Sequence, residues 1–413
     1  MKQYYKIKSG LLIALAAFIF SFLGCKEDIG ITVNKIGEKP GPVTNVQSTP
    51  ISGGAIIKYD LPLSEDLRYV KATYKLDNGI QRETKSSIYK NTITVDGYGI
   101  EGEYEVELQT VSVGEVASDP ITVKVNALRP PYLLVLDKMN TSGEITSTFG
   151  GLNLNYINET KANLVIRIIK KDSTGKWVPV ESEYTNFEAG TIKLRGQDAV
   201  ATDFGIYIED RWDHTSDTLM VNLTPIEEVL IPRNNWAWSY LPGDAGNRGG
   251  GFDVGGIWDG NTNRGYLSTN AGGTSTTLPN SITFDLGTPA LISRMQIWAT
   301  RYSNISDVYG PAHIYDFEIY GSNSPSSTGA WDNSWTLLGH FTSSRPTGFG
   351  FGVPATTAER DNIRDNGETY EFPDPTGFPK FRYIRFKNYA TWNGSYEGGP
   401  NFFIYEMYLF GQL

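Results

Sequence analysis

The chain has little of the chemistry on which most enzymes and nucleic-acid-binding proteins rely. Its 413 residues include one cysteine and three histidines, and its 36 lysines and arginines are outnumbered by 46 aspartates and glutamates. A single cysteine excludes an intrachain disulfide. The formal charge of −10 makes nucleic acid and anionic membrane surfaces poor partners, because both repel an acidic protein. We therefore expect no nucleic-acid partner.

Catalytic signatures are also missing. The sequence has no Gly-x-Ser-x-Gly, His-Glu-x-x-His or phosphate-binding loop. A glycoside hydrolase would need two carboxylates that face each other across a cleft. The acids of the C-terminal part are instead expected to lie unpaired in loops, so the sequence predicts no enzyme activity; they include Asp307, Glu359, Asp361, Asp365 and Glu368.

Long apolar runs are lacking, with one exception near the start of the chain. Residues 11–22 follow three lysines and are too short to span a membrane, but they suit a signal peptide over residues 1–24. Phe22-Leu-Gly-Cys25 resembles a bacterial lipobox, in which the cysteine sulfur is lipidated after cleavage behind Gly24. The resemblance implies a lipid anchor on Cys25, with an uncleaved anchor as the alternative.

The residues that follow Cys25 bear on where an anchored protein would face. Lys26-Glu27-Asp28 resembles the acidic tag that sends some lipoproteins of glycan-degrading bacteria to the outer cell surface; a solvated charge cluster is the alternative. The resemblance implies an outer-membrane lipoprotein that faces the exterior. Loss of the three signal-peptide lysines would take the formal charge from −10 to −13.

Short strands predict an all-β chain of three β-sandwiches, with helix nearly absent. Residues 25–40 have no apolar period and are expected to form a tether. Residues 41–129 resemble a fibronectin type III domain, and residues 130–229 are predicted to form an immunoglobulin-like sandwich after a stiff joint at Pro130-Pro131. In the second sandwich, Asp210-Arg-Trp-Asp-His214 either pairs His214 with an aspartate in a site or forms a polar loop in which Trp212 caps the sandwich.

Residues 230–413 form the third predicted sandwich and hold seven of the nine tryptophans. Ile282, Phe284 and Leu286 alternate with polar residues, and after a turn at Gly287 a second alternating strand runs toward Arg301. The glycine-rich segment 233–252 cannot nucleate a helix, and so long a loop within a domain is usually functional.

This last part resembles the discoidin domain, a jelly-roll β-sandwich shared by many carbohydrate-binding modules. The resemblance rests on an Asp-Gly-Asn turn at Asp259, a strand that ends Asp-Leu-Gly, a Phe-Glu-Ile-Tyr-Gly-Ser-Asn strand, a Tyr-Ile-Arg-Phe strand and a closing Glu-Met-Tyr-Leu-Phe-Gly. The whole order resembles accessory surface lipoproteins of bacterial glycan-utilisation loci. It implies glycan as a partner, together with an outer-membrane glycan import complex.

The discoidin resemblance also implies a structural calcium ion. The matching positions are Asp259, Asn261 and Glu406. Calcium takes six to eight oxygen ligands, so backbone carbonyls around the turn would have to supply most of them. The alternative is an arginine: Arg264, where the family commonly has threonine, would pair with a carboxylate and replace the ion.

Discoidin modules bind ligands with loops at one end of the sandwich. The residues that these loops offer for a sugar are Trp392, Tyr396, His313, Arg301, Tyr302 and Trp236. Trp392 and Tyr396 either stack on a sugar or pack inside, and His313 either bonds a ligand or is structural. For Trp236 and Trp238, plugging the end of the sandwich is favoured over contact with a sugar. Trp298 is expected to pack against a neighbouring module or loop.

The sequence allows three functions to be compared, of which the second, an enzyme, is not expected. The first is a non-catalytic lipoprotein that binds glycans, for which one ring covering ~100 Å² of sugar gives only weak, micromolar to millimolar affinity after the cost of association. Many tethered copies would compensate on one polymer. The second is a glycoside hydrolase, and the third is a scaffold that docks an outer-membrane transporter through exposed aromatic residues without binding sugar.

Overall fold

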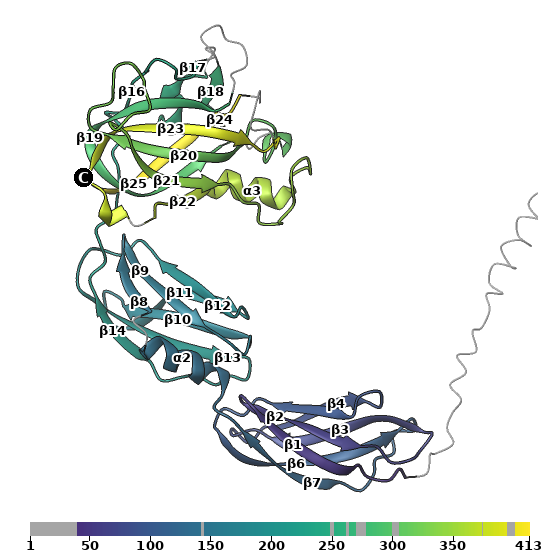
Figure 1. Cartoon of the computed structure of the whole chain (residues 1–413). Coiled ribbons are helices and arrows are strands. Elements are labelled where there is room, and N and C mark those ends of the chain that lie inside the picture. The colour runs from purple at the N-terminus through teal and green to yellow at the C-terminus, as the bar shows by residue number, and fades with distance from the viewer. Residues whose placement is uncertain are drawn as a thin grey trace, which may run out of the picture.

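In a computed structural model, the chain forms three β-rich units that follow one another (Figure 1). The structure describes residues 39–141, 144–247, 252–261, 264–269, 278–299, 305–373, 375–394 and 401–413. The predicted signal peptide and Cys25 lie outside these residues. Within them, no helix combines the length and apolar character needed to cross a membrane.

The first unit is a sandwich of two antiparallel sheets, with strand orders β1-β2-β5 and β4-β3-β6-β7. In β2, Ala55, Ile57 and Tyr59 are buried while Ile56 and Lys58 are exposed, so the period of two predicted from the sequence puts one face on the core. The strands are β1 (Thr44–Ile51), β2 (Gly54–Asp60), β3 (Leu67–Lys75), β4 (Gln81–Ser87), β5 (Thr92–Asp96), β6 (Gly102–Ser112) and β7 (Ile121–Ala127).

The second unit is also a sandwich, with sheets β12-β9-β8 and β11-β10-β13-β14. Pro131, expected to stiffen a joint, instead begins helix α2 (Pro131–Thr141), whose residues Tyr132, Val135 and Met139 join the core. Proline suits this first helical position because the N–H it lacks would have no partner there. The strands are β8 (Ile145–Thr148), β9 (Gly151–Ile157), β10 (Leu164–Lys171), β11 (Trp177–Thr185), β12 (Ala189–Leu194), β13 (Thr202–Asp210) and β14 (Leu219–Leu223).

The third unit is a jelly-roll sandwich around one long strand. β19 (Asn280–Trp298) is continuous through the turn predicted at Gly287, where φ is 78°. Its first half pairs with β23 and its second half with β25, so this strand lies at the centre of one eight-stranded sheet of order β15-β25-β19-β23-β20-β21, with β16 and β22 also paired to it. The other strands are β15 (Val229–Leu230), β16 (Ala237–Trp238), β17 (Gly246–Asn247), β18 (Tyr266–Thr269), β20 (Ile314–Ser322), β21 (Thr336–Thr342), β22 (Glu368–Glu371), β23 (Phe381–Thr391), β24 (Phe403–Ile404) and β25 (Glu406–Gln412).

A helix appears in the jelly roll where loops were expected. α3 (Thr357–Asn366) begins with a capping box between Thr356 and Glu359, and it contains three of the acids that the sequence placed in loops. Short 3₁₀ turns also occur at η1 (Val254–Ile257), η2 (Ile305–Asp307) and η3 (Pro375–Gly377). The local capping signal was present, but the apolar spacing of this segment is too poor to indicate a helix.

The joint between the first two sandwiches is closed by the turn after β13. Trp212 packs against the core of the first sandwich, and a Cβ on Gly97 would lie 2.9 Å from its ring. His214 bonds Asp210 through Nδ1 at 2.9 Å, and its Nε2 lies 4.0 Å from Asp77 of the first sandwich. Trp212 therefore covers the neighbouring sandwich and not, as the sequence predicted, its own, and His214 does pair with an aspartate, Asp210.

The joint between the second and third units is held by charge. Glu371 of β22 pairs with Arg195 at 3.0 Å and with Lys193, while Glu228 pairs with Arg294 at 3.0 Å. Glu228 also accepts a hydrogen bond from Ser293 at 2.6 Å. Ion pairs that share carboxylates order fewer side chains per contact than isolated pairs do, so this network orients the jelly roll.

Replacing Trp212 with alanine should loosen the first joint without unfolding either sandwich. The ring is half-buried, so we expect a loss of about 1–3 kcal/mol in unfolding free energy. Backbone amides near Gly97–Gly99 should exchange hydrogen faster, as measured by mass spectrometry. Trp177→Ala, on β11, is the control; equal exchange in the two variants would contradict this role.

Candidate functional site

The loop end of the jelly roll does not expose the tryptophan predicted to touch sugar. Trp392 is 6% exposed and packs edge-to-face against Tyr309 and Tyr315, with ring centroids 5.0 and 5.1 Å away. Its Nε1 donates a hydrogen bond to Ser343 Oγ at 2.9 Å. Of the two roles left open by the sequence, Trp392 takes the packing role.

His313 is likewise a buried structural residue. Its Nδ1 accepts a hydrogen bond from the Tyr309 backbone N–H at 2.9 Å, so the proton is on Nε2, which donates to Glu368 at 2.8 Å. Trp236 is 6% exposed and stacks on Phe284 at 5.6 Å, so it plugs the sandwich end as the sequence favoured. The remaining predicted ligand residues, Arg301, Tyr302 and Tyr396, lie outside the described residues.

Trp298 covers the helical side of the jelly roll. Its ring is 7% exposed and its Nε1 donates to the Arg364 carbonyl at the end of α3, at 3.1 Å. Trp298 therefore packs against a neighbouring segment, as expected, and that segment is α3.

At the predicted calcium position, the structure places two arginines. Glu406 is fully buried and pairs with Arg233, whose guanidinium lies 4.1 Å from the Tyr408 ring centroid. Asp259 is exposed; it accepts a hydrogen bond from the Asn261 backbone N–H at 2.8 Å and lies 3.7 Å from Arg264. Sequence reasoning proposed Arg264 as the replacement cation but missed Arg233, which comes from the preceding loop.

These residues do not fit a calcium ion. One Glu406 oxygen is already bound by Arg233, and calcium would need six to eight oxygens beside two guanidiniums. No group of three or more His, Cys, Asp or Glu side chains gathers within the described part of the chain. Glu406 Oε2 is buried without a hydrogen-bond partner. Calcium binding stays a prediction that this arrangement does not favour.

The protonation of Glu406 follows from its burial. Desolvation raises the pKa of Glu406 to about 7, although the Arg233 guanidinium acts in the opposite direction. The folded protein therefore binds a proton more tightly than the unfolded chain does, and this site contributes stability that is present at low pH and is lost as the pH rises through about 7.

Glu406→Gln should remove that pH dependence. In the unchanged protein, the temperature at the midpoint of thermal unfolding should decrease as the pH is raised from 5 to 7.5. In the variant this decrease should be smaller, because glutamine does not titrate. Calorimetry at five pH values measures it. Addition of calcium or EDTA should leave both midpoints unchanged, and a calcium-dependent rise would restore the metal assignment.

Aromatic side chains gather instead on the outer face of strands β20, β21 and β23, where Trp331 and His340 are exposed and the tyrosines are half-buried. Phe317 and Ile319 of β20 point into the core, so the alternate residues of that strand face outward. Register places Glu318 opposite both Lys387 of β23 and His340 of β21. We call this face the aromatic platform; its members are Asp316, Glu318, Tyr320, Trp331, His340, Lys387 and Tyr389.

Glu318 organises the centre of the platform. Its Oε2 accepts hydrogen bonds from Tyr320 at 2.7 Å and from Tyr389 at 2.6 Å. Burial, reinforced by the bond to Glu318, raises the pKa of Tyr320 to about 12 and raises the pKa of Tyr389 as well. Both phenols therefore stay protonated at neutral pH and hold their rings in place on the sheet.

Trp331 and Lys387 complete the surface. The Trp331 side chain lies over the sheet with 42% exposure, and its ring meets Tyr320 edge-to-face at 4.9 Å. The Lys387 ammonium lies 4.6 Å from the Trp331 centroid and 4.8 Å from that of Tyr389. At the other edge, exposed His340 donates to Asp316 at 2.5 Å.

A buried arginine fixes Trp331 from below. Arg385 is 1% exposed, and its guanidinium lies 4.0 Å from the Trp331 ring centroid. It donates to Asp244 at 2.8 Å and to the Gly329 carbonyl at 2.9 Å, which ties two loops to the sheet. The loop that carries Trp331 is thus preorganised.

The platform can bind a polar molecule with flat apolar faces. Its rings cover C–H surfaces, and its carboxylates, ammonium and imidazole offer acceptors and donors for hydroxyl groups. Sequence reasoning missed it because it searched the loops. The alternation of Asp316, Glu318 and Tyr320 along one strand was the available signal.

Three family models match the chain, each described as a domain of unknown function. They cover residues 40–127 (DUF4959), 128–234 (DUF5126) and 258–411 (DUF5000). A comparison with curated proteins finds no match. None of the three models reaches half of the chain.

Solved structures with similar folds include a SusE-like protein, at 25% identity and a TM-score of 0.42, with 68% of this chain and 99% of that chain covered. The family 32 carbohydrate-binding module of Streptococcus pneumoniae EndoD matches at 14% identity and a TM-score of 0.24, with 44% of this chain and 94% of that chain covered. Two fibronectin type III domains of chicken tenascin match at 13% identity and a TM-score of 0.20, with 44% of this chain and 99% of that chain covered. TM-scores below 0.5 add nothing to the functional argument, which depends on the chain's own geometry.

Proposed function

We propose that this protein is a non-catalytic, cell-surface lipoprotein that captures glycans through the aromatic platform of its jelly roll. The observation that carries the proposal is the combination of rings and hydroxyl-binding groups on one exposed sheet face. A pyranose presents C–H groups on its faces and hydroxyls at its edge, and the platform offers partners for both. The fixed rings lower the entropy that binding costs.

The carboxylates of the platform support binding rather than hydrolysis. Asp316 and Glu318 come from the same strand and point the same way, so they do not face each other across a bound sugar. Glu318 already accepts two phenol protons, and Asp316 is engaged by His340. Neither is placed to act as a general acid opposite a nucleophile.

The lipid anchor and the surface location belong to the same proposal. They rest on Phe22-Leu-Gly-Cys25 and the Lys26-Glu27-Asp28 segment that follows it. The charge-linked joint between the second and third units keeps the platform oriented relative to its supports. Anchored copies in one membrane would bind a polymer together and offset a weak single-site affinity. Association with an outer-membrane glycan import complex completes the proposal.

Trp331→Ala should weaken glycan binding without unfolding the protein. Loss of a ring that covers ~100 Å² of sugar removes about 2.5 kcal/mol, which corresponds to a tenfold or greater rise in Kd. Affinity electrophoresis through gels that contain neutral and acidic polysaccharides measures it. Trp238→Ala is the control, because that ring is 38% exposed but lies off the platform. If the two variants were slowed equally in every gel that slows the unchanged protein, the proposal that the platform binds glycan would be wrong.

Cys25→Ser should release the protein from membranes. If Cys25 carries acyl chains, the variant loses both metabolic labelling with radioactive palmitate and recovery in the outer-membrane fraction. Surface protease treatment of intact cells should remove the unchanged protein. Unchanged membrane recovery of the variant would indicate an uncleaved anchor instead.

A second candidate function, docking to a membrane partner, has its own observation. Phe349, Phe351 and Val353 are 47%, 45% and 41% exposed in a loop without charged residues between Arg345 and Glu359. Arg345 pairs with Glu359 at 2.8 Å and donates to the Val353 carbonyl at 2.8 Å, so the loop is rigid. Burial alone would raise the pKa of Glu359, but bonds from Arg345 and Thr347 lower it to about 2.

Docking and glycan capture separate experimentally. Phe349→Ser, which leaves the Arg345 pair intact, should reduce in-cell crosslinking to an outer-membrane transporter only if the loop docks. Retention on polysaccharide gels should not change in this variant. A protein that no polysaccharide retains but that loses crosslinks on this substitution would be a scaffold.

A further inference from the structure

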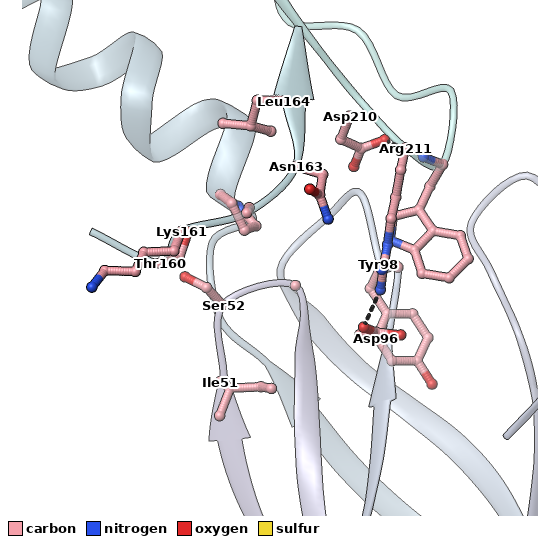
Figure 2. Close-up of a pocket in the computed structure, with 15 residues that line it drawn as sticks. Ile51, Ser52, Asp96, Tyr98, Thr160, Lys161, Asn163, Leu164, Asp210 and Arg211 are labelled. Carbon is pink, nitrogen blue, oxygen red and sulfur yellow. Dashed lines mark hydrogen bonds and ion pairs between the residues drawn. The ribbon is translucent and has the colours of Figure 1, made fainter. Parts of the chain in front are cut away.

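A cavity lies between the two N-terminal sandwiches, away from the aromatic platform. It measures about 390 Å³, within the ~300–1,000 Å³ typical of ligand pockets. Figure 2 shows its walls: Ser52 and Asp96 from the first sandwich, with Thr160, Asn163 and Arg211 from the second. No single sandwich forms this site, since turns from both contribute.

The charged groups of this cavity are already balanced. Arg211 pairs with Asp96 at 2.7 Å, which is the contact drawn in Figure 2. Asp210 accepts hydrogen bonds from His214 Nδ1 at 2.9 Å and from the Trp212 backbone N–H at 2.8 Å. With Lys161, the lining carries two positive and two negative side chains. A charged ligand therefore gains little here, and an uncharged polar ligand is favoured.

Asn163 is the group best placed to recognise such a ligand. It is exposed at the cavity, and no side chain in the described part of the chain bonds its amide. The amide offers both a donor and an acceptor, which suits a hydroxyl group. Figure 2 labels this side chain among the residues that line the cavity, together with Arg211.

A second, smaller cavity of about 280 Å³ continues the first. The two share Asn163, Leu164, Asp210 and Arg211, so they adjoin along the end of the second sandwich. Tyr184 lines the smaller cavity and is 72% exposed. An exposed ring beside a cavity that also has polar lining groups repeats, at a second place, the combination found on the platform.

We propose that this joint groove, the two cavities on either side of Asn163, is a second glycan site that takes a short neutral oligosaccharide. Its ligand class rests on the proposed function. One sugar occupies the larger cavity with hydroxyls bonded by Asn163 and Arg211, and the next stacks on Tyr184. Because the larger cavity has walls from both sandwiches, a bound oligosaccharide also stabilises their joint.

The test is titration calorimetry of the full mature protein with maltotriose, cellotriose, mannotriose and xylotriose. At least one should bind at two sites per chain. Asn163→Ala and Tyr184→Ala should each weaken one site tenfold or more, and Trp331→Ala should weaken the other. Phe187→Ala is the control, because that ring is 69% exposed but lines neither cavity.

The outcomes separate the two sites. If the sugar binds at one site and only Trp331→Ala weakens it, the groove proposal is wrong and the platform proposal stands. If only Asn163→Ala and Tyr184→Ala weaken binding, the platform proposal is wrong and the groove proposal stands. Binding of none of the four sugars overturns the groove. Tighter groove binding of trigalacturonate than of every neutral trisaccharide overturns the neutral class. Ligand that occupies the groove should also slow amide exchange at Gly97–Gly99, as a bridge between the sandwiches requires.

Discussion

The aromatic platform of the jelly roll depends on one buried ion pair, Arg385 with Asp244. A buried pair repays its desolvation only when its remaining donors and acceptors are bonded. That condition is met: Arg385 also bonds the Gly329 carbonyl, and Asp244 also accepts from Ser281 at 2.8 Å and from the Leu241 backbone N–H at 3.1 Å. The pair thereby joins β23 and β19 to two loops and supports the Trp331 ring.

Arginine acts as a fixed internal cation at several other places in this module. Arg233 neutralises the buried Glu406 on β25, Arg345 holds the apolar loop through Glu359, and Arg294 links the jelly roll to Glu228. The planar guanidinium can bond a carboxylate and a carbonyl together while its face contacts a ring. This explains how long loops stay ordered in a chain that has one cysteine and therefore no intrachain disulfide.

The joints between units serve the same end. At the first, a tryptophan of one sandwich completes the core of the other; at the second, shared carboxylates bind arginine and lysine. Apolar insertion and ion-pair networks both resist rotation between domains better than a flexible linker would. These contacts connect the three units, and a groove lies where the first two sandwiches meet.

The sequence by itself determined the all-β class and most of the strands, because alternation of apolar and polar residues is a local property. It also indicated that Trp236 would plug the sandwich, since a ring next to a strand usually packs. It did not indicate α2, which begins within a proline pair, or α3, which has a capping box but few apolar residues.

The tertiary structure alone decided which aromatic residues are exposed. Trp392 directly follows β23 and Trp331 lies in the loop between β20 and β21. Their local sequences do not tell them apart, yet Trp392 is covered by Tyr315 and Phe351 while Trp331 lies on the sheet against Arg385. Likewise, Arg233 and Glu406 lie 173 positions apart in the chain, so only folding could show that an arginine occupies the predicted ion position. Exposure and charge pairing arise from contacts between distant segments, and a local pattern does not contain them.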